Sequence, residues 1–399
     1  MNVYQGSPIV YSCVTEFLDQ AQTSFIASNY LVASDEERTV LFGDYTPSFP
    51  LSNAGWNKGL ELARYYGTYA DNKYSLVEEQ QWSYSVEAAA TQIFDNYVIH
   101  KKYHPLFTAG PSAMAANFTP YTIIHYPFYS RWYKLDSILE KTYASDKKDN
   151  NTITTNVSYR YNNFDKLLFE EEFYNSKGEK IIKRVNRPKQ MLDSGRDPDG
   201  IYAGMVSGHL LDPVVEEIQL NNGNPISLIK TSYFTPFAGL YVPQNVDRQI
   251  GGNPMERLVN YHAYDNKGNL LSASYEKGPK SCYVWGYGGQ YLIAKIENCE
   301  YSSLSDVLDG TSTVESFRNN LIPTDAAVNA FLSTLRNHLT LKQAQVTTYT
   351  YRPLVGMTSA TDAAGVTTYY EYDDFQCLKR VKDQEGNIVK QNIYHYKGQ

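Results

Sequence analysis

One short pattern recurs along this chain: an alternating run, a Tyr-Asp or Tyr-Asn pair, a turn glycine and a second alternating run. Its clearest copy lies at 261–285, where Tyr264 and Asp265 precede Gly268 and the extended pattern resumes at Leu270. Alternation of apolar and polar residues is typical of a half-buried strand. Asp bonds its own backbone in turns, and glycine takes the positive φ that closes a short hairpin loop. The pattern predicts a strand, a tight turn and a second strand.

The same unit returns before and after this copy. Self-similarity at a spacing of about 20 to 50 residues is typical of a repeat architecture. The turn of each copy sets the register of the strand that follows, so we expect the motif residues to have a structural role. The motif residues are Tyr174, Asn175 and Gly178; Tyr264, Asp265 and Gly268; Gly365; Tyr372 and Asp373; and Gly386.

These repeats resemble those of the bacterial Rhs/YD-repeat family, which is named for its Tyr-Asp dipeptides. Two further tracts, 282–298 and 346–358, are similar to a cell-surface branch of that family. Trp285 and Gly286 belong to the first tract, and the resemblance implies a structural role for both. It extends from about Ser130 to the C-terminus and is weaker before that point. In the family, such sheets wind into a hollow case that in some members encloses a C-terminal toxin.

We therefore expect a mainly β protein: a long-stranded antiparallel YD-repeat sheet that curls into a partial shell, with one small helical insertion. The expected regions are hairpins and YD repeats at 1–300, the helical insertion at 301–345 and C-terminal YD repeats at 346–399. Val328 and Leu332 belong to an apolar stripe at helical spacing within the insertion.

Four local expectations follow from turn and cap residues. Residues 186–200 are rich in Pro, Gly and Asp and are expected to form a loop. Thr324 is expected to cap a helix. Asn222 and Gly223 predict a two-residue hairpin turn. Gln376 stands where the family usually has glycine, so the turn there is expected to differ locally.

Composition supports a β-rich protein and argues against a nucleic-acid partner and a membrane-spanning helix. Tyrosine accounts for 36 of 399 residues, and it suits strand surfaces because the ring is buried while the hydroxyl finds a polar partner. The net charge is −7 with both signs interspersed, so we expect no nucleic-acid partner. No apolar run approaches the roughly 18 residues of a membrane-spanning helix.

The N-terminal segment lacks the charged and apolar regions of a signal peptide. Two interpretations are open: a cytosolic product, or a fragment of a longer exported protein. The resemblance favours the fragment and an extracellular or cell-surface location. A truncated repeat array leaves strand edges open, so we expect self-association through a terminal edge, or pairing with upstream repeats of the same protein.

Metal sites are not expected. His100 and His104 are spaced like zinc ligands on a helix, but their context is typical of a strand, where that spacing separates them by about 13 Å. Asp193, Asp197 and Asp199 resemble part of a calcium loop but lack its 12-residue frame and terminal Glu. We interpret them as an Asx-rich turn, and we expect no cofactor.

Cysteine chemistry leaves two alternatives. Cys282 and Cys299 bracket a predicted hairpin, and they either pair in an exported protein or remain two buried thiols. Cys13 and Cys377 complete a set too scattered for a disulfide framework.

We expect a non-enzymatic scaffold of a secreted or cell-surface protein that mediates interactions or encapsulation. The alternative is a carbohydrate-binding surface built from exposed tyrosines, with glycans as partners. A third hypothesis is a hydrolase, because the sequence cannot show whether two carboxylates lie the 5 to 9 Å or so apart that glycoside hydrolysis needs. No residue is predicted to be catalytic.

Overall fold

The computed structural model describes residues 11–32, 39–43, 52, 58–101, 121–144, 152–309, 319–338 and 341–394. Strands make up 56% and helices 13% of these residues, so the predicted mainly β class is confirmed. Within them, twenty strands belong to one antiparallel sheet and three to a second. The sequence around Pro47 also predicts a loop, and the polar segment 145–151 predicts a turn. Both segments, and His104, lie outside the described residues.

The chain forms two compact units, which are described separately. The first contains 1–184 and 220–224, and the second contains 185–219 and 225–399. The elements up to residue 186 are β1 (Cys13–Phe17), β2 (Ser24–Tyr30), β3 (Thr39–Phe42), β4 (Glu61–Ala70), β5 (Lys73–Val86), η1 (Ala88–Ala90), β6 (Gln92–Lys101), β7 (Tyr121–Ser130), β8 (Tyr133–Tyr143), β9 (Thr152–Tyr161), β10 (Leu168–Tyr174) and β11 (Lys180–Asn186).

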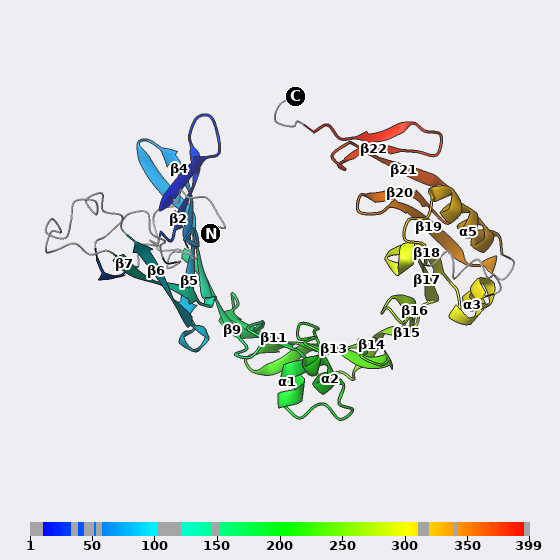
Figure 1. Ribbon diagram of the computed structural model, residues 1–399, viewed down its shortest axis with the longest axis horizontal. Helices are drawn as coiled ribbons and strands as arrows, with labels where there is room; N and C mark the ends of the chain where they lie inside the picture. The colour runs from blue at the N-terminus through cyan, green and yellow to red at the C-terminus, as the bar shows by residue number, and fades with distance from the viewer. Residues whose placement is uncertain are drawn as a thin grey trace, which may run out of the picture. The chain divides into compact units, whose positions relative to one another are not determined.

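Most of the elements after residue 186 are labelled in Figure 1. They are α1 (Pro188–Asp193), α2 (Ile201–Ser207), β12 (Glu216–Asn221), β13 (Asn224–Phe237), β14 (Leu240–Ile250), β15 (Glu256–Tyr264), β16 (Leu270–Tyr275), β17 (Lys280–Gly286), η4 (Tyr287–Gly289), β18 (Tyr291–Glu297), α3 (Tyr301–Asp309), α5 (Asp325–Asn337), β19 (Gln345–Arg352), β20 (Gly356–Thr361), β21 (Thr367–Tyr372), β22 (Leu378–Lys382) and β23 (Ile388–Gln391).

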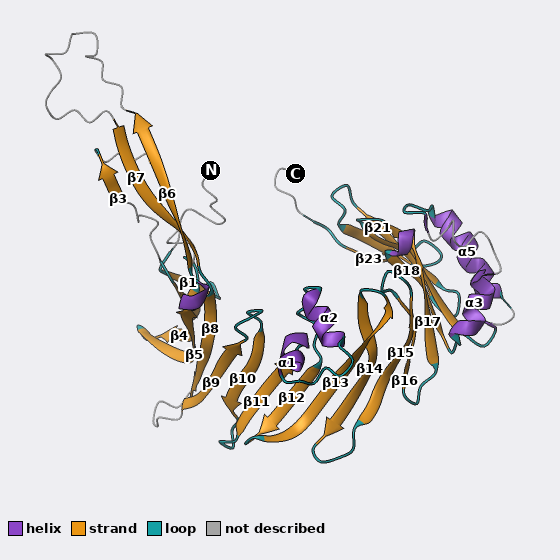
Figure 2. Ribbon diagram, turned by 60° about the horizontal axis from the view of Figure 1, so that its bottom comes forward, coloured by secondary structure: helices purple, strands orange, loops and turns teal. Residues whose placement is uncertain are grey.

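In the first unit, antiparallel pairing joins β1, β2, β4, β5, β8, β9, β10 and β11 in that order. Strands β3, β6 and β7 come between these strands in the chain and form the separate three-stranded sheet (Figure 2). The β4–β5 hairpin has a turn that contains no glycine. Asp71 and Asn72 take φ of 52° and 58°, the two positive values of a type I′ turn.

Charged side chains bridge neighbouring strands of this unit. Glu170 is 3% exposed and lies within 3.1 Å of Arg160 and 2.6 Å of Arg184. Two guanidinium groups therefore compensate one buried carboxylate, which is what burial of a charge requires.

In the second unit, β13 to β18 pair antiparallel in chain order. β18 then pairs with β19, so the helical segment 298–344 leaves the sheet and returns to its neighbouring position. β19 to β23 continue in chain order. The larger hydrophobic core cluster of this unit lies between β17–β19 and the helices of that segment, and Figure 1 shows these helices beside the strands.

α3 and α5 occupy the range of the predicted helical insertion. Thr324 accepts a hydrogen bond from the backbone N–H of Ala327 at 3.2 Å, which confirms the predicted cap. Val328, Leu332 and Leu335 face the sheet and are at most 3% exposed. The apolar stripe of the sequence is thus the buried face of α5.

The prediction of a simple loop at 186–200 was wrong. α1 begins at Pro188 and is followed by α2. Proline suits the first helical position because its missing N–H has no acceptor within the helix. Both helices are at most seven residues long, too short to show a periodic pattern, and Met191 and Met205 anchor them in a separate buried cluster.

Candidate functional site: the Tyr-Asp turns

The turn after β15 shows how the motif works. The carboxylate oxygen Oδ1 of Asp265 accepts hydrogen bonds from the backbone N–H groups of Lys267 and Asn269, each at 2.9 Å. The backbone N–H of Gly268 donates to the Asp265 carbonyl at 3.1 Å. Gly268 has φ of 88°, which confirms the predicted positive value. One side chain therefore satisfies two loop donors that strand pairing leaves free.

Asn175 makes the same turn after β10. Its Oδ1 accepts from the backbone N–H groups of Lys177 and Glu179 at 2.9 and 3.0 Å, and Gly178 has φ of 75°. Its amide also donates to the Glu179 carboxylate at 2.8 Å. This hydrogen bond lowers the pKa of Glu179. An amide oxygen thus replaces the carboxylate of the Tyr-Asp copies.

Three turns of this kind follow one another in the C-terminal strands, at Asp362, Asp373 and Asp383. Each aspartate side chain accepts the backbone N–H of the residue four positions later, at 2.7 to 2.9 Å. The turns of Gly365 and Gly386 lie at the same end of the sheet, where the backbone N–H of Thr367 donates to the Gln384 side chain at 3.2 Å. The Asp373 turn lies at the opposite end of β21 and β22.

Gln376 adopts φ of 65° in the Asp373 turn. Its backbone N–H donates to the Asp373 carbonyl at 3.0 Å, as Gly268 does to Asp265. The loss of glycine therefore leaves the hydrogen-bonded turn in place. The cost is a residue with a side chain in the left-handed region, which glycine adopts without penalty.

Two tyrosines of the motif bond a neighbouring strand, whereas a third is exposed. The hydroxyl of Tyr264 donates to the Pro243 carbonyl at 2.8 Å, and that of Tyr372 donates to the Met357 carbonyl at 3.0 Å. Each ring thereby fastens its turn to the preceding strand. A Cβ at Gly356 would lie 2.2 Å from the Tyr372 hydroxyl, so glycine leaves room for this ring. Tyr174, in the first unit, is 59% exposed.

Trp285 and Gly286 lead into a loop that receives the Asp265 turn. The Trp285 indole N–H donates to the Leu270 carbonyl at 2.8 Å. The Lys267 ammonium group donates to the Gly288 carbonyl, and the Asn269 amide donates to the Gly289 carbonyl at 2.9 Å. The structure thus places the Asp265 turn against the loop that follows β17.

Tyr287 was not among the predicted site residues. Its side chain is fully buried, and its hydroxyl accepts the backbone N–H of Tyr351 at 2.7 Å. The rings of Tyr287, Tyr291 and Tyr351 pack against one another with centroids 4.9 to 5.9 Å apart. The signal in the sequence is the glycine-rich tract from Gly286 to Gly289, which indicates a turn but not the distant contact of Tyr287.

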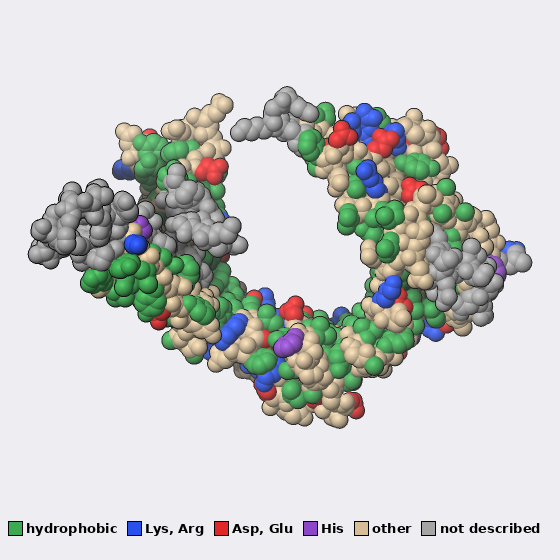
Figure 3. All heavy atoms as spheres, in the orientation of Figure 1, with side chains coloured by type: hydrophobic (Ala, Val, Ile, Leu, Met, Phe, Trp, Pro, Cys, Tyr) green, Lys and Arg blue, Asp and Glu red, His purple; other side chains and the backbone are tan. Residues whose placement is uncertain are grey.

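Ionic pairs add to the C-terminal hairpins. Glu371 accepts from Lys382 and lies 3.9 Å from Arg380 across the β21–β22 pair. The hydrogen bond from Lys382 lowers the pKa of Glu371. Basic and acidic side chains accordingly lie side by side over these strands in Figure 3.

Two of the aspartates that resemble part of a calcium loop make structural contacts. Asp193 pairs with Lys189 on α1. Asp197 accepts hydrogen bonds from two backbone N–H groups at the start of α2, at 3.0 and 2.8 Å. His100 lies in strand β6, as expected. Within the described ranges, no group of three or more His, Cys, Asp or Glu side chains is placed to hold a metal ion.

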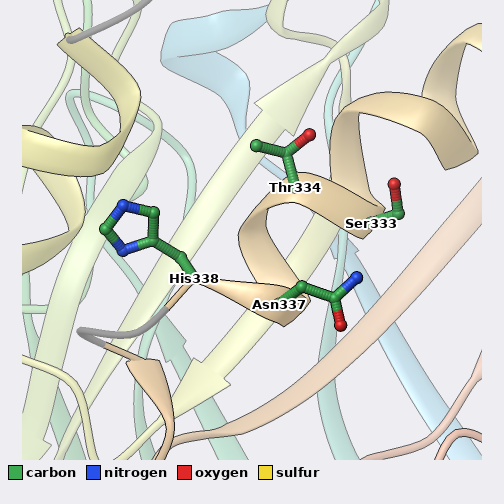
Figure 4. A pocket seen from close by; sticks show the side chains of 4 residues that line it. All are labelled: Ser333, Thr334, Asn337 and His338. Atoms are coloured by element: carbon green, nitrogen blue, oxygen red, sulfur yellow. The ribbon is translucent and has the colours of Figure 1, made fainter.

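An open depression of about 480 Å³ lies beside the last turns of α5 (Figure 4). Its lining comes from Ser333, Thr334, Asn337 and His338. Both hydroxyl groups donate to the Ala330 carbonyl, at 2.8 and 3.3 Å. They are thereby used by the helix itself, and we assign no role to this depression.

No protein-family model and no curated protein matches this chain. Similar solved structures include a Tc holotoxin pore from Photorhabdus luminescens, with 9% identity over 93% of this chain and 18% of that chain, at a TM-score of 0.29. A TcdB2-TccC3 crystal structure has 9% identity over 98% and 21%, at 0.25. A porin-like protein from Bacteroides uniformis has 11% identity over 80% and 88%, at 0.21.

The chain thus spans about a fifth of the length of the first two structures. TM-scores this low carry no argument about fold or function, so the Rhs/YD resemblance stays a prediction. None of the helices in the described ranges is both long enough and apolar enough to cross a membrane.

Proposed function

We propose that this protein is a non-enzymatic repeat scaffold of the Rhs/YD type that mediates interactions or encapsulation. The observation that carries the proposal is the use of the motif's polar groups. The carboxylates of Asp265, Asp373 and Asp383 accept loop N–H groups, and the hydroxyls of Tyr264 and Tyr372 hold neighbouring strands. Their hydrogen bonds position backbone, which is the task of a scaffold motif.

Open strand edges indicate the kind of contact such a scaffold makes. Among the described residues, β1 pairs only with β2, and β23 pairs only with β22. Ile388 and Val389 of β23 are 50% and 69% exposed. An unpaired edge presents free N–H and C=O groups that another strand can bond. We therefore propose as partners further repeats of the same protein or a second copy of the chain.

We propose a secreted or cell-surface location on the strength of the family resemblance. Fractionation of the native source into secreted, surface and cytosolic protein tests this directly. Recovery in the cytosolic fraction alone contradicts it.

Sedimentation velocity over a wide concentration range tests the edge proposal. We expect the parent chain to self-associate, and Val389→Lys to shift it towards monomer because lysine blocks edge pairing. Val366→Lys is the matched control, since Val366 is 51% exposed and lies at the β20–β21 turn. A parent chain that stays monomeric at high concentration, with β23 protected from hydrogen exchange, contradicts the edge proposal.

Exposed tyrosines support carbohydrate binding as a second candidate. Tyr275 and Tyr174 are 74% and 59% exposed, and flat aromatic faces are suited to stacking on sugar rings. A glycan array with the parent chain and with Tyr275→Ala tests it. Binding that survives both Tyr275→Ala and Tyr174→Ala contradicts this candidate. Turnover of a bound glycan that stops on loss of one carboxylate favours the hydrolase hypothesis.

A further inference from the structure

Cys282 and Cys299 meet where β17 borders the start of the helical segment. They are 17 positions apart in sequence, and the Cys282 thiol donates to the Cys299 carbonyl oxygen at 3.1 Å. The backbone N–H of Cys299 donates to the Lys280 carbonyl at 3.1 Å. Cys282 itself pairs with Ile296 in β18. The side chain of Cys282 therefore lies in direct contact with Cys299.

Both cysteines belong to the helix-covered core. Cys282 is 0% and Cys299 6% exposed, and they pack in one cluster with Leu304 and Leu308 of α3. Both are free thiols in this structure, as are Cys13, which is exposed, and Cys377. Cys282 and Cys299 thus share one buried cluster, to which Cys13 and Cys377 do not belong.

The two thiols are not equivalent. An interaction between the two thiol side chains, together with burial, raises the pKa of the Cys282 thiol, whereas the same interaction lowers the pKa of Cys299. Of the two, Cys299 is therefore the thiol that forms the thiolate more readily. A thiolate is the species that attacks a disulfide, whereas a buried neutral thiol is inert.

We propose that Cys282 and Cys299 form an intramolecular disulfide when the protein is exposed to an oxidised small-molecule disulfide such as glutathione disulfide. The Cys299 thiolate attacks one sulfur of glutathione disulfide and expels a glutathione thiolate. The deprotonated Cys282 then attacks the Cys299 sulfur of the mixed disulfide and expels the second glutathione thiolate. The two protons lost by the protein are taken up by the two glutathiones, so the protein is oxidised by two electrons and the reagent reduced by two.

The bond fixes the start of the helical cover to the sheet. α3 begins at Tyr301, two positions after Cys299, so the cross-link joins β17 to the segment that leads into α3. Because the pair is buried, the reagent reaches it when this cover opens locally or while the chain folds. The same cross-link then restricts later opening.

Peptide mapping of the full-length protein tests the proposal. The protein is refolded with glutathione disulfide or with dithiothreitol, denatured, alkylated and digested. After oxidation we expect a linked pair of peptides containing Cys282 and Cys299, while Cys13 and Cys377 are alkylated or joined to glutathione. Alkylation of both Cys282 and Cys299 after oxidation overturns the proposal, as does linkage of either one to Cys13 or Cys377.

Thermal unfolding supplies a second readout. Closing a loop of this length is expected to raise Tm by about 5–10 °C in the oxidised protein. The Cys13→Ala, Cys377→Ala double variant retains the pair and should show the full shift. Cys282→Ala should show none, and a shift of equal size in this variant overturns the assignment. The mapping of the parent chain decides the matter if Cys282→Ala fails to fold.

Discussion

The helix-covered strands β17–β19 and the uncovered hairpins β21–β23 use the same antiparallel pairing, but they are stabilised in different ways. In the covered strands, Val284, Ile293 and Ile296 are at most 1% exposed. In β21, β22 and β23, no side chain is buried. The uncovered hairpins instead concentrate turn hydrogen bonds, ion pairs and tyrosine contacts.

The difference separates two contributions to folding that usually occur together: burial of apolar surface and the geometry of the turns. Burial of apolar surface supplies most of the free energy of folding, at roughly 25 cal/mol per Å². Turn residues fix the register, because a slip of one residue would move every side chain to the other face. The covered strands contain the first contribution, and the uncovered hairpins rely mainly on the second.

Truncation of a core side chain should have the largest effect. Ile293→Ala removes a side chain that is 0% exposed and should lower the free energy of unfolding by about 2–5 kcal/mol. Ile388→Ala is the control in the uncovered hairpins, where Ile388 is 50% exposed, and it should change the free energy by no more than about 0.5 kcal/mol. Denaturant titration measures both. If both substitutions lowered the free energy of unfolding equally, the buried side chains of the covered strands would contribute no more to stability than exposed ones.

Valine at a turn glycine should cost about 1–3 kcal/mol, because a β-branched residue is strained at positive φ. Gly268 and Gly365 both have φ of 88°. A Cβ at Gly268 lies 3.2 Å from Leu240, whereas a Cβ at Gly365 meets nothing within 4 Å. Gly268→Val should therefore be the more destabilising in denaturant titration. A Gly268→Val protein with the stability of the parent would contradict the turn assignment.

Removal of the turn carboxylate should loosen one uncovered hairpin. Asp373→Ala leaves the backbone N–H groups of Phe375 and Cys377 without the acceptor that they bond at 3.0 and 2.9 Å, at a cost of about 1–2 kcal/mol. Asp373→Asn is the control, because Asn175 makes the same bonds with an amide oxygen. Hydrogen exchange at Cys377 should accelerate in the alanine variant alone.

Glycine at position 376 should stabilise the same hairpin. Gln376→Gly removes a side chain from the left-handed region, where φ is 65°, and should raise the free energy of unfolding by about 1 kcal/mol. The gain is small because glycine also increases the entropy of the unfolded chain. Slower hydrogen exchange across β21–β22 is the expected sign, and faster exchange would show that the glutamine side chain contributes contacts of its own.

Acid should weaken the uncovered hairpins before the covered strands. The pKa values of Glu371 and Asp383 are lowered by hydrogen bonds from Lys382 and Asn387, respectively. A lowered pKa means that the stabilisation is fully present above the ordinary carboxyl pKa of about 4 and is lost as pH falls through the lower folded value. Hydrogen exchange between about pH 5 and 2, corrected for intrinsic rates, should show protection falling in β21–β23 first. Unchanged protection there would argue against these two contacts.

The sequence predicts local features of this fold better than distant ones. Gly268 at positive φ and the Thr324 cap depend on neighbours within four positions, so the pattern contains the whole interaction. The same holds for the β4–β5 turn at Asp71, although glycine is absent. The mainly β class follows because such hairpins fill most of the chain.

Contacts between distant segments could not be predicted from the sequence pattern. Nothing near Tyr287 indicates that its hydroxyl bonds the backbone of Tyr351. The nearness of the Cys282 and Cys299 thiols depends on how the chain leaves β18, so the sequence left two alternatives. α1 was missed because six residues show less than two helical turns of periodicity.

The hydrogen bond between Tyr287 and Tyr351 joins residues 64 positions apart, and this has a kinetic consequence. Every strand of the second unit from β13 to β17 pairs with its immediate successor, so those hairpins can close as soon as both strands exist. β19 must instead close a loop that contains α3 and α5 before it bonds β18. The chain loses the entropy of closing this loop before the β18–β19 contact contributes any stabilisation, so formation of that contact is slow. Docking of β19 is therefore the step expected to set the folding rate of this unit.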